Sequence, residues 1–164
     1  MLYTTTRRSA TSTVALYALI GLILTSVHHA YGAYVYATPW RLHVVFVASA
    51  TALVILAALA VLRAHPAGWL GRAAWWLFAL TVLIVPILSL GVFEGFYNHV
   101  LKNALFLAGL PARDMVRLFP PPRYELPNDA FFEITGVLQV VPAALAAAKL
   151  YRLVRSRRTS RRRS

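Results

Sequence analysis

Four long apolar stretches constrain this chain more than any other feature of its sequence. None of them contains a run of charged side chains, and they cover residues 14–36, 42–62, 73–93 (with an extension to about 108) and 130–151. A helix needs about 20 mostly apolar residues to cross a bilayer. The sequence therefore predicts an all-α, multi-pass protein of the cell membrane. We expect one four-helix transmembrane bundle within residues 1–152 and a basic tail at 153–164.

The composition also favours a membrane protein over a soluble domain. Only 13% of the residues are charged and the mean hydropathy is +0.62, whereas soluble domains carry about 25% charged residues. The chain has no cysteine, which excludes disulfides and thiolate metal ligands. A net charge of +12 would suggest a nucleic-acid partner for a soluble protein. Within a membrane protein the placement of the charges matters more, and we expect no nucleic-acid partner.

The basic residues are distributed unequally between the two ends of the predicted bundle. Of the 17 lysines and arginines, 12 precede the first stretch, separate the second from the third, or lie at or beyond the end of the fourth, and 5 lie toward the other side. The side richer in lysine and arginine usually faces the cytoplasm. Both termini are therefore predicted to be cytoplasmic, with one longer outer loop at about 109–129. The basic tail is expected to contact anionic lipid, at about 1 kcal/mol per basic residue near the surface.

Acidic residues and histidines gather toward the predicted outer side. All five acidic residues and four of the five histidines fall there. Counting from the inner ends places residues of all four helices at similar depths. Ionisable groups within a bilayer are costly and usually functional, so we predict a site in the outer half of the bundle. Its candidate members are His28, His29, His43, Glu94, His99, Asp129 and Glu133, with Glu94 and Glu133 as candidate catalytic carboxylates.

Imidazole combined with carboxylate indicates a metal site. These are the ligands of zinc, iron, manganese and copper in proteins. The leading hypothesis is therefore a divalent metal, serving an oxidoreductase or hydrolase that acts on a lipid-like substrate. Neither the Glu-x-x-His pattern of dimetal bundles nor an H-E-x-x-H zinc motif is present. Glu94 and His99 are five residues apart, about 140° around an α-helix, so both can bind one ion only if the helix is distorted there.

Helical periodicity indicates which side chains point inward. His28 and His29 are about 100° apart on an α-helix, so we expect at most one of them to point straight into the site and at least one to meet Glu94 and Glu133. In the fourth stretch, residues in three- and four-residue steps form a stripe with small members, which favours close helix packing. That stripe consists of Asp129, Glu133, Gly136, Val140, Ala143 and Ala147. Asp129 is equally well placed to be a helix N-cap.

Several other functions remain open from the sequence. A buried carboxylate beside a histidine can support metal-free acid–base isomerisation. A haem can lie between His99 and either His28 or His29. A non-catalytic accessory subunit can use the 109–129 loop to contact a larger membrane complex, and the chain can also form a homo-oligomer. The sequence does not decide whether the protein is an enzyme.

The predicted orientation can be tested by cysteine labelling, because the natural chain contains no cysteine. Single variants Pro121→Cys and Ser164→Cys would be exposed to a membrane-impermeant thiol reagent in intact cells. We expect labelling at position 121 and protection at position 164. Labelling at 164 with protection at 121 would overturn the orientation.

Overall fold

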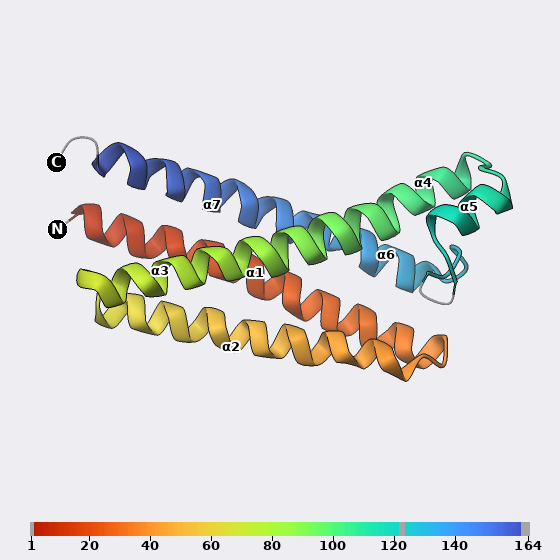
Figure 1. Ribbon diagram of the computed structural model, residues 1–164, viewed down its shortest axis with the longest axis horizontal. Coiled ribbons are helices and arrows are strands. Elements are labelled where there is room, and N and C mark those ends of the chain that lie inside the picture. The colour runs from red at the N-terminus through yellow and green to blue at the C-terminus, as the bar shows by residue number, and fades with distance from the viewer. Residues whose placement is uncertain (1, 122–123, 162–164) are drawn as a thin grey trace.

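The protein consists of four long helices in the computed structural model (Figure 1). The structure describes the backbone of residues 2–121 and 124–161 and the side chains of residues 9–121 and 124–157. Arg123 and the last three residues of the predicted tail lie outside the described residues. In chain order the elements are α1 (Leu2–Val35), η1 (Pro39–Leu42), α2 (His43–Ala64), α3 (Gly68–Val82), η2 (Leu83–Leu101), α4 (Lys102–Leu107), α5 (Ala112–Leu118), α6 (Ala130–Leu138) and α7 (Val140–Arg161). The expected all-α architecture with four long apolar helices is confirmed.

The helices alternate in direction around the bundle. Helix α1 packs against α2 and α7, and the continuous third helix, α3–η2–α4, packs against α2 and α7. The start of α1, the end of α7 and the α2–α3 connection lie at one end, which we call the terminal end (Figure 1). The α1–α2 turn, α4 and α5 lie at the opposite end, which we call the loop end. Which end faces the cytoplasm remains a prediction.

The outer faces of the helices are apolar and suit a bilayer. Ile23, Phe46, Leu53 and Trp76 are between 58% and 73% exposed. Such a surface is far more apolar than water-soluble monomers tolerate. Within the described part of the chain, four segments are long and apolar enough to span a membrane: Ser9–Val35, Pro39–Ala64, Gly68–Leu107 and Ala130–Arg157.

The interior changes in character along the bundle. Toward the terminal end it is an apolar core that includes Val14, Ile55, Phe78 and Ala146. Toward the loop end the buried residues are mainly polar or charged. The polar cluster described below therefore rests on an apolar core.

The third and fourth helices approach closely through small residues of the third helix and the stripe of the fourth. Gly91 of η2 lies directly on Ala143, and a methyl group at position 91 would overlap that side chain. Gly95 lies one turn further along, against Val140. Without appreciable hydrophobic attraction between helices in lipid, such van der Waals contact is a main source of packing energy.

The third helix is not a regular α-helix throughout. Residues Leu83–Leu101 form a π-helix, with Pro86 inside it. Proline lacks the backbone N–H that an α-helix requires. The Ser89 hydroxyl donates to the carbonyl of Ile84, five residues earlier, at 2.9 Å. The sequence indicated irregularity at Pro86 but not its type.

A glycine in the left-handed backbone conformation follows the third long helix at the loop end. Gly109, with φ of 77°, ends α4, and the N–H of Leu110 donates to the carbonyl of Leu105 at 3.0 Å. This is the Schellman arrangement, in which glycine avoids the steric cost of positive φ. The 109–129 connection then forms α5, a short helix that our sequence analysis did not predict.

A pair of glycine variants tests the close packing. We expect Gly91→Ala to destabilise the bundle by about 1–3 kcal/mol, since overpacking forces neighbouring groups to move. Gly21→Ala is the matched control, because a methyl group there meets Pro142 at an ordinary 3.8 Å. Thermal unfolding in detergent measures both. Equal stability of the two variants would contradict the proposed role of the Gly91–Ala143 contact.

Candidate metal centre

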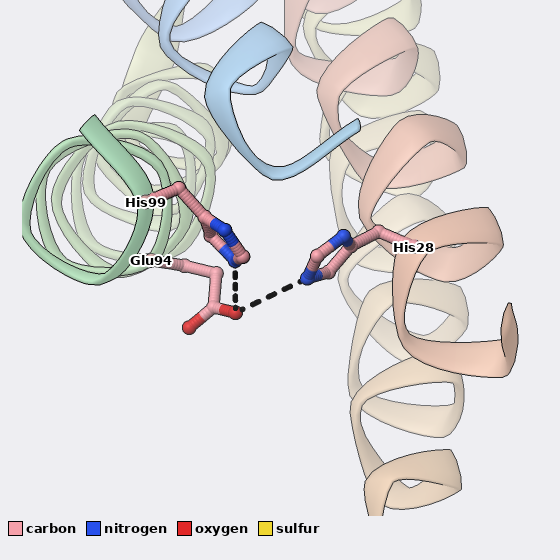
Figure 2. A group of neighbouring side chains, drawn as sticks. All are labelled: His28, Glu94 and His99. Atoms are coloured by element: carbon pink, nitrogen blue, oxygen red, sulfur yellow. Dashed lines mark ion pairs between the residues drawn. The ribbon is translucent and has the colours of Figure 1, made fainter. Parts of the chain in front are cut away.

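Three histidine nitrogens converge on one carboxylate oxygen inside the bundle. Glu94 Oε1 lies 3.5 Å from Nε2 of His28, 3.5 Å from Nε2 of His29 and 3.6 Å from Nε2 of His99. Figure 2 shows Glu94 and His99 reaching from the third helix toward His28 on α1. The ligand atoms of His28, Glu94 and His99 all lie within 4.8 Å of one another, so this group can hold a metal ion.

The cluster is almost completely shielded from solvent. His28, His29 and His99 are 0%, 7% and 2% exposed. The Nε2 of His28 has no hydrogen-bond partner among residues 2–121 and 124–161. Burial of polar atoms without partners costs free energy. The convergence therefore needs a physical explanation beyond packing.

The π-helix places Glu94 and His99 on the same side of the third helix. In a π-helix the backbone hydrogen bond joins residues five apart, so these residues stack along the axis. The separation between Glu94 and His99 is five residues, and both reach the same centre. The distortion that the sequence required for a shared site is therefore present. π-Helical segments also occur frequently at functional sites.

His28 and His29 both approach Glu94, but only His28 belongs to the group whose ligand atoms all lie within 4.8 Å of one another. The rings of His28 and His29 are nearly perpendicular, at 87°. Their backbone positions diverge by about 100°, but each side chain bends toward Glu94, which lies between them. Rotation of flexible side chains thus offsets the angular difference of the backbone.

The far side of each of two imidazole rings is held by a hydrogen-bond partner. His28 Nδ1 lies 3.0 Å from Thr135 Oγ1, and the Thr135 hydroxyl donates to the backbone carbonyl of Phe131 at 2.8 Å. Since the hydroxyl proton is used there, Nδ1 of His28 carries the proton and donates to Thr135. In the neutral ring this leaves the lone pair on Nε2, facing Glu94.

His99 is held in the same way by a carboxylate. Its Nδ1 donates to Glu133 Oε2 at 2.7 Å, so the neutral ring also directs the Nε2 lone pair inward. The second oxygen of Glu94 accepts a hydrogen bond from Asn98 Nδ2 at 2.7 Å. Histidines that bind metals usually donate their other ring N–H to such a partner. Three inward-facing atoms, from His28, Glu94 and His99, are thus acceptors whose outer partners are already in place.

A buried ion pair supports the far side of His99. Lys102 Nζ donates to Glu133 Oε1 at 2.9 Å and to the backbone carbonyl of Glu125 at 2.7 Å. Lys102 is 2% exposed. Arg41, also buried, lies 3.6 Å from Glu125. The positive charge of Lys102 neutralises Glu133 and holds it against His99.

Aromatic and glycine contacts set the positions of the rings. Phe132 stacks on His28 with ring centroids 4.1 Å apart, and contacts His99 edge-on at 5.2 Å. Gly136 leaves room for the His99 ring, which a methyl group at that position would overlap. Small size at position 136 is therefore a requirement of the cluster as well as of helix packing.

Two predicted site residues have other contacts. His43 is exposed, stacks on Trp40 and contacts the Trp40 carbonyl through Nδ1. Asp129 caps α6 by accepting from the N–H of Phe132 at 2.8 Å, and it also accepts from Tyr31 at 3.0 Å. Glu133 is present at the cluster, but it contacts His99 and Lys102 rather than the converging nitrogens.

Several residues that organise the cluster lie outside the predicted ligand set. Thr135, Asn98, Lys102 and Phe132 all hold a ligand or its partner. Glu94, Asn98 and Lys102 follow one another at four-residue steps, a spacing that indicates a shared helix face. No comparable signal identifies Thr135 or Phe132, because their roles depend on the neighbouring helix.

Comparison with protein-family models, with curated proteins and with solved structures gives no match for this chain. Any assignment of function therefore depends on the geometry of the cluster itself.

The Lys102–Glu133 pair can be tested by breaking it and then removing its partner. We expect Lys102→Met to destabilise the protein by about 3–5 kcal/mol, because it leaves a buried carboxylate poorly compensated. Adding Glu133→Gln should restore much of the loss. Lys149→Met, at an exposed position on α7, is the control. Thermal unfolding in detergent measures the stability of each variant. A Lys102→Met variant as stable as the Lys149→Met control would contradict this role.

Proposed function

We propose that this protein is a membrane-embedded metalloprotein that binds one divalent transition-metal ion between α1 and the third helix. Three of its ligands are Nε2 of His28, Nε2 of His99 and Oε1 of Glu94, whose atoms all lie within 4.8 Å of one another. We propose His29 as the fourth, because its Nε2 lies 3.5 Å from Glu94 Oε1. Glu133, Thr135 and Asn98 orient the ligands from outside. In this assignment Glu94 is a metal ligand, and Glu133 is a positioning residue that acts through His99.

The spacing of the converging atoms carries this proposal. The separations of 3.5, 3.5 and 3.6 Å between Glu94 Oε1 and the three nitrogens exceed the N–H···O hydrogen-bond range of about 2.7–3.2 Å. Metal–ligand bonds of about 2.0–2.2 Å place neighbouring ligands of a tetrahedral ion about 3.3–3.5 Å apart. The distances from Glu94 Oε1 to the three nitrogens thus suit neighbouring ligands of one ion better than direct hydrogen bonds, and His28, Glu94 and His99 form the compact part of the set.

The charge balance also favours a cation. Glu94 contributes one negative charge to a group of neutral imidazoles, and the charges of Glu133 and Lys102 offset each other. A divalent cation would compensate the Glu94 carboxylate in an interior where an unpaired charge is costly. Three nitrogens and one oxygen suit zinc best in this spacing, while iron, copper and manganese accept the same donor atoms.

The geometry supports a metal ion more strongly than a haem or a metal-free acid–base pair. The rings of His28 and His99 are in direct T-shaped contact, with centroids 4.7 Å apart, so a macrocycle cannot lie between them. His99 and Glu133 do form a hydrogen-bonded pair at 2.7 Å, but Lys102 already holds that carboxylate in an ion pair, and no imidazole lies that close to Glu94. The apolar outer surface suits contact with lipid, and we propose lipid-like molecules as the substrate class of a membrane hydrolase or oxidoreductase.

Elemental analysis of the purified protein tests the metal site. We expect about one equivalent of metal per chain in the wild type. Glu94→Gln and His99→Ala should each reduce metal affinity at least 10–100-fold, the effect typical of losing even an outer-shell partner. His43→Ala is the matched control, since His43 lies outside the cluster. Wild-type protein that cannot be loaded with zinc, iron, copper or manganese, or equal loss in the control, would refute the proposal.

A further inference from the structure

Two buried polar side chains lie next to the cluster and take no part in it. Thr25 of α1 is 0% exposed, and Gln139, between α6 and α7, is 1% exposed. The Thr25 hydroxyl and both amide atoms of Gln139 have no hydrogen-bond partner within the described part of the chain. Buried polar groups are almost always hydrogen-bonded. Two such residues at one place therefore call for a ligand.

Contacts between α1 and the fourth helix place Thr25 and Gln139 at the same level. The His28–Thr135 hydrogen bond lies on one side of them, toward the loop end. The packing of Gly21 against Pro142 lies on the other side. Thr25 falls between His28 and Gly21 on α1, and Gln139 falls between Thr135 and Pro142 on the antiparallel partner. The two side chains therefore share one layer of the interior.

This layer also adjoins the third helix next to Glu94. The side chain of Gln139 lies against Gly95, where an added methyl group would come within 3.3 Å of its Cβ. Thr25 is three residues before His28 and four before His29, so it is on the same face of α1 as both. Thr25 and Gln139 thus border the cluster on the side toward the terminal end.

We propose that Thr25 and Gln139 bind a small oxygen-donor ligand, a water molecule or hydroxide, that also coordinates the metal. The inference rests on the proposed function and extends it, because it makes the metal centre an open site. The Thr25 hydroxyl and the Gln139 amide together offer donors and acceptors, and a buried water typically makes about three hydrogen bonds. Catalytic zinc sites bind water in addition to their protein ligands and can expand to five-coordination.

An apolar core would be the simpler solution at this layer if no ligand were bound. Replacing buried polar groups by apolar groups of the same shape is often neutral or stabilising when nothing is bound to them. Retention of both polar side chains at adjoining positions therefore favours a ligand. Because Thr25 and Gln139 border the metal centre, the molecule they bind must be small enough to contact the metal and both side chains at once.

Azide binding to cobalt-loaded protein is the experiment. Azide is a small anion that competes with water for an open metal position, and cobalt(II) reports its ligands through visible absorption. We expect azide to change the spectrum of the wild type. Thr25→Val and Gln139→Leu should leave cobalt content unchanged and weaken azide binding about tenfold or more, as loss of outer-shell contacts typically does. Thr51→Val is the control, because that buried hydroxyl is already bonded to the Val47 carbonyl at 2.7 Å.

The outcomes separate this inference from the proposed function. Failure of the wild type to bind cobalt would remove both. Stoichiometric cobalt with no spectral response to azide, or with equal azide affinity in Thr25→Val, Gln139→Leu and the wild type, would overturn the open site and leave the metal site standing. A higher melting temperature of cobalt-loaded Thr25→Val than of the cobalt-loaded wild type would also overturn it. Valine is expected to stabilise the protein only if the Thr25 hydroxyl binds nothing.

Discussion

A carboxylate in the interior of a membrane bundle must be compensated, and the surroundings of Glu94 follow from that requirement. An isolated charge in a low-dielectric interior is expensive. Three imidazole nitrogens approach one of its oxygens, and Asn98 donates to the other. The helices that carry these groups are α1 and the π-helical segment, so the need to satisfy Glu94 joins these helices at the loop half of the bundle.

The groups that surround Glu94 and its histidines come from parts of the chain that are otherwise unrelated. The fourth helix supplies Thr135 and Glu133, which orient two histidines, and Gly136, which gives one ring its space. The 109–129 connection supplies a backbone carbonyl to Lys102, which in turn holds Glu133. A loop at one end of the bundle is thereby linked to the interior. The apolar core toward the terminal end provides the rigid support that a site with defined geometry needs.

Helical periodicity predicted some features of the buried cluster and could not predict others. The inward stripe of the fourth helix was predictable because small and polar residues recur at helical spacing. The imidazole side chains of His28 and His29 both reach Glu94 from different directions on α1, but only His28 belongs to the group with Glu94 and His99 whose ligand atoms lie within 4.8 Å of one another. Similar depth suggested His43 as a member, but depth along the membrane normal carries no information about the direction around the helix axis. His43 instead stacks on Trp40.

The sequence by itself determined the class of protein and the set of candidate groups. Long apolar stretches leave few alternatives to membrane-spanning helices, because backbone polar groups must be satisfied within each segment. Only the tertiary structure decided which groups meet. The π-helix brings Glu94 and His99 to one side, and the register of α1 against the fourth helix brings His28 to Thr135. The helix register depends on contacts between residues far apart in the chain, which local spacing does not encode, and the sequence indicated an irregular helix at Pro86 without its type.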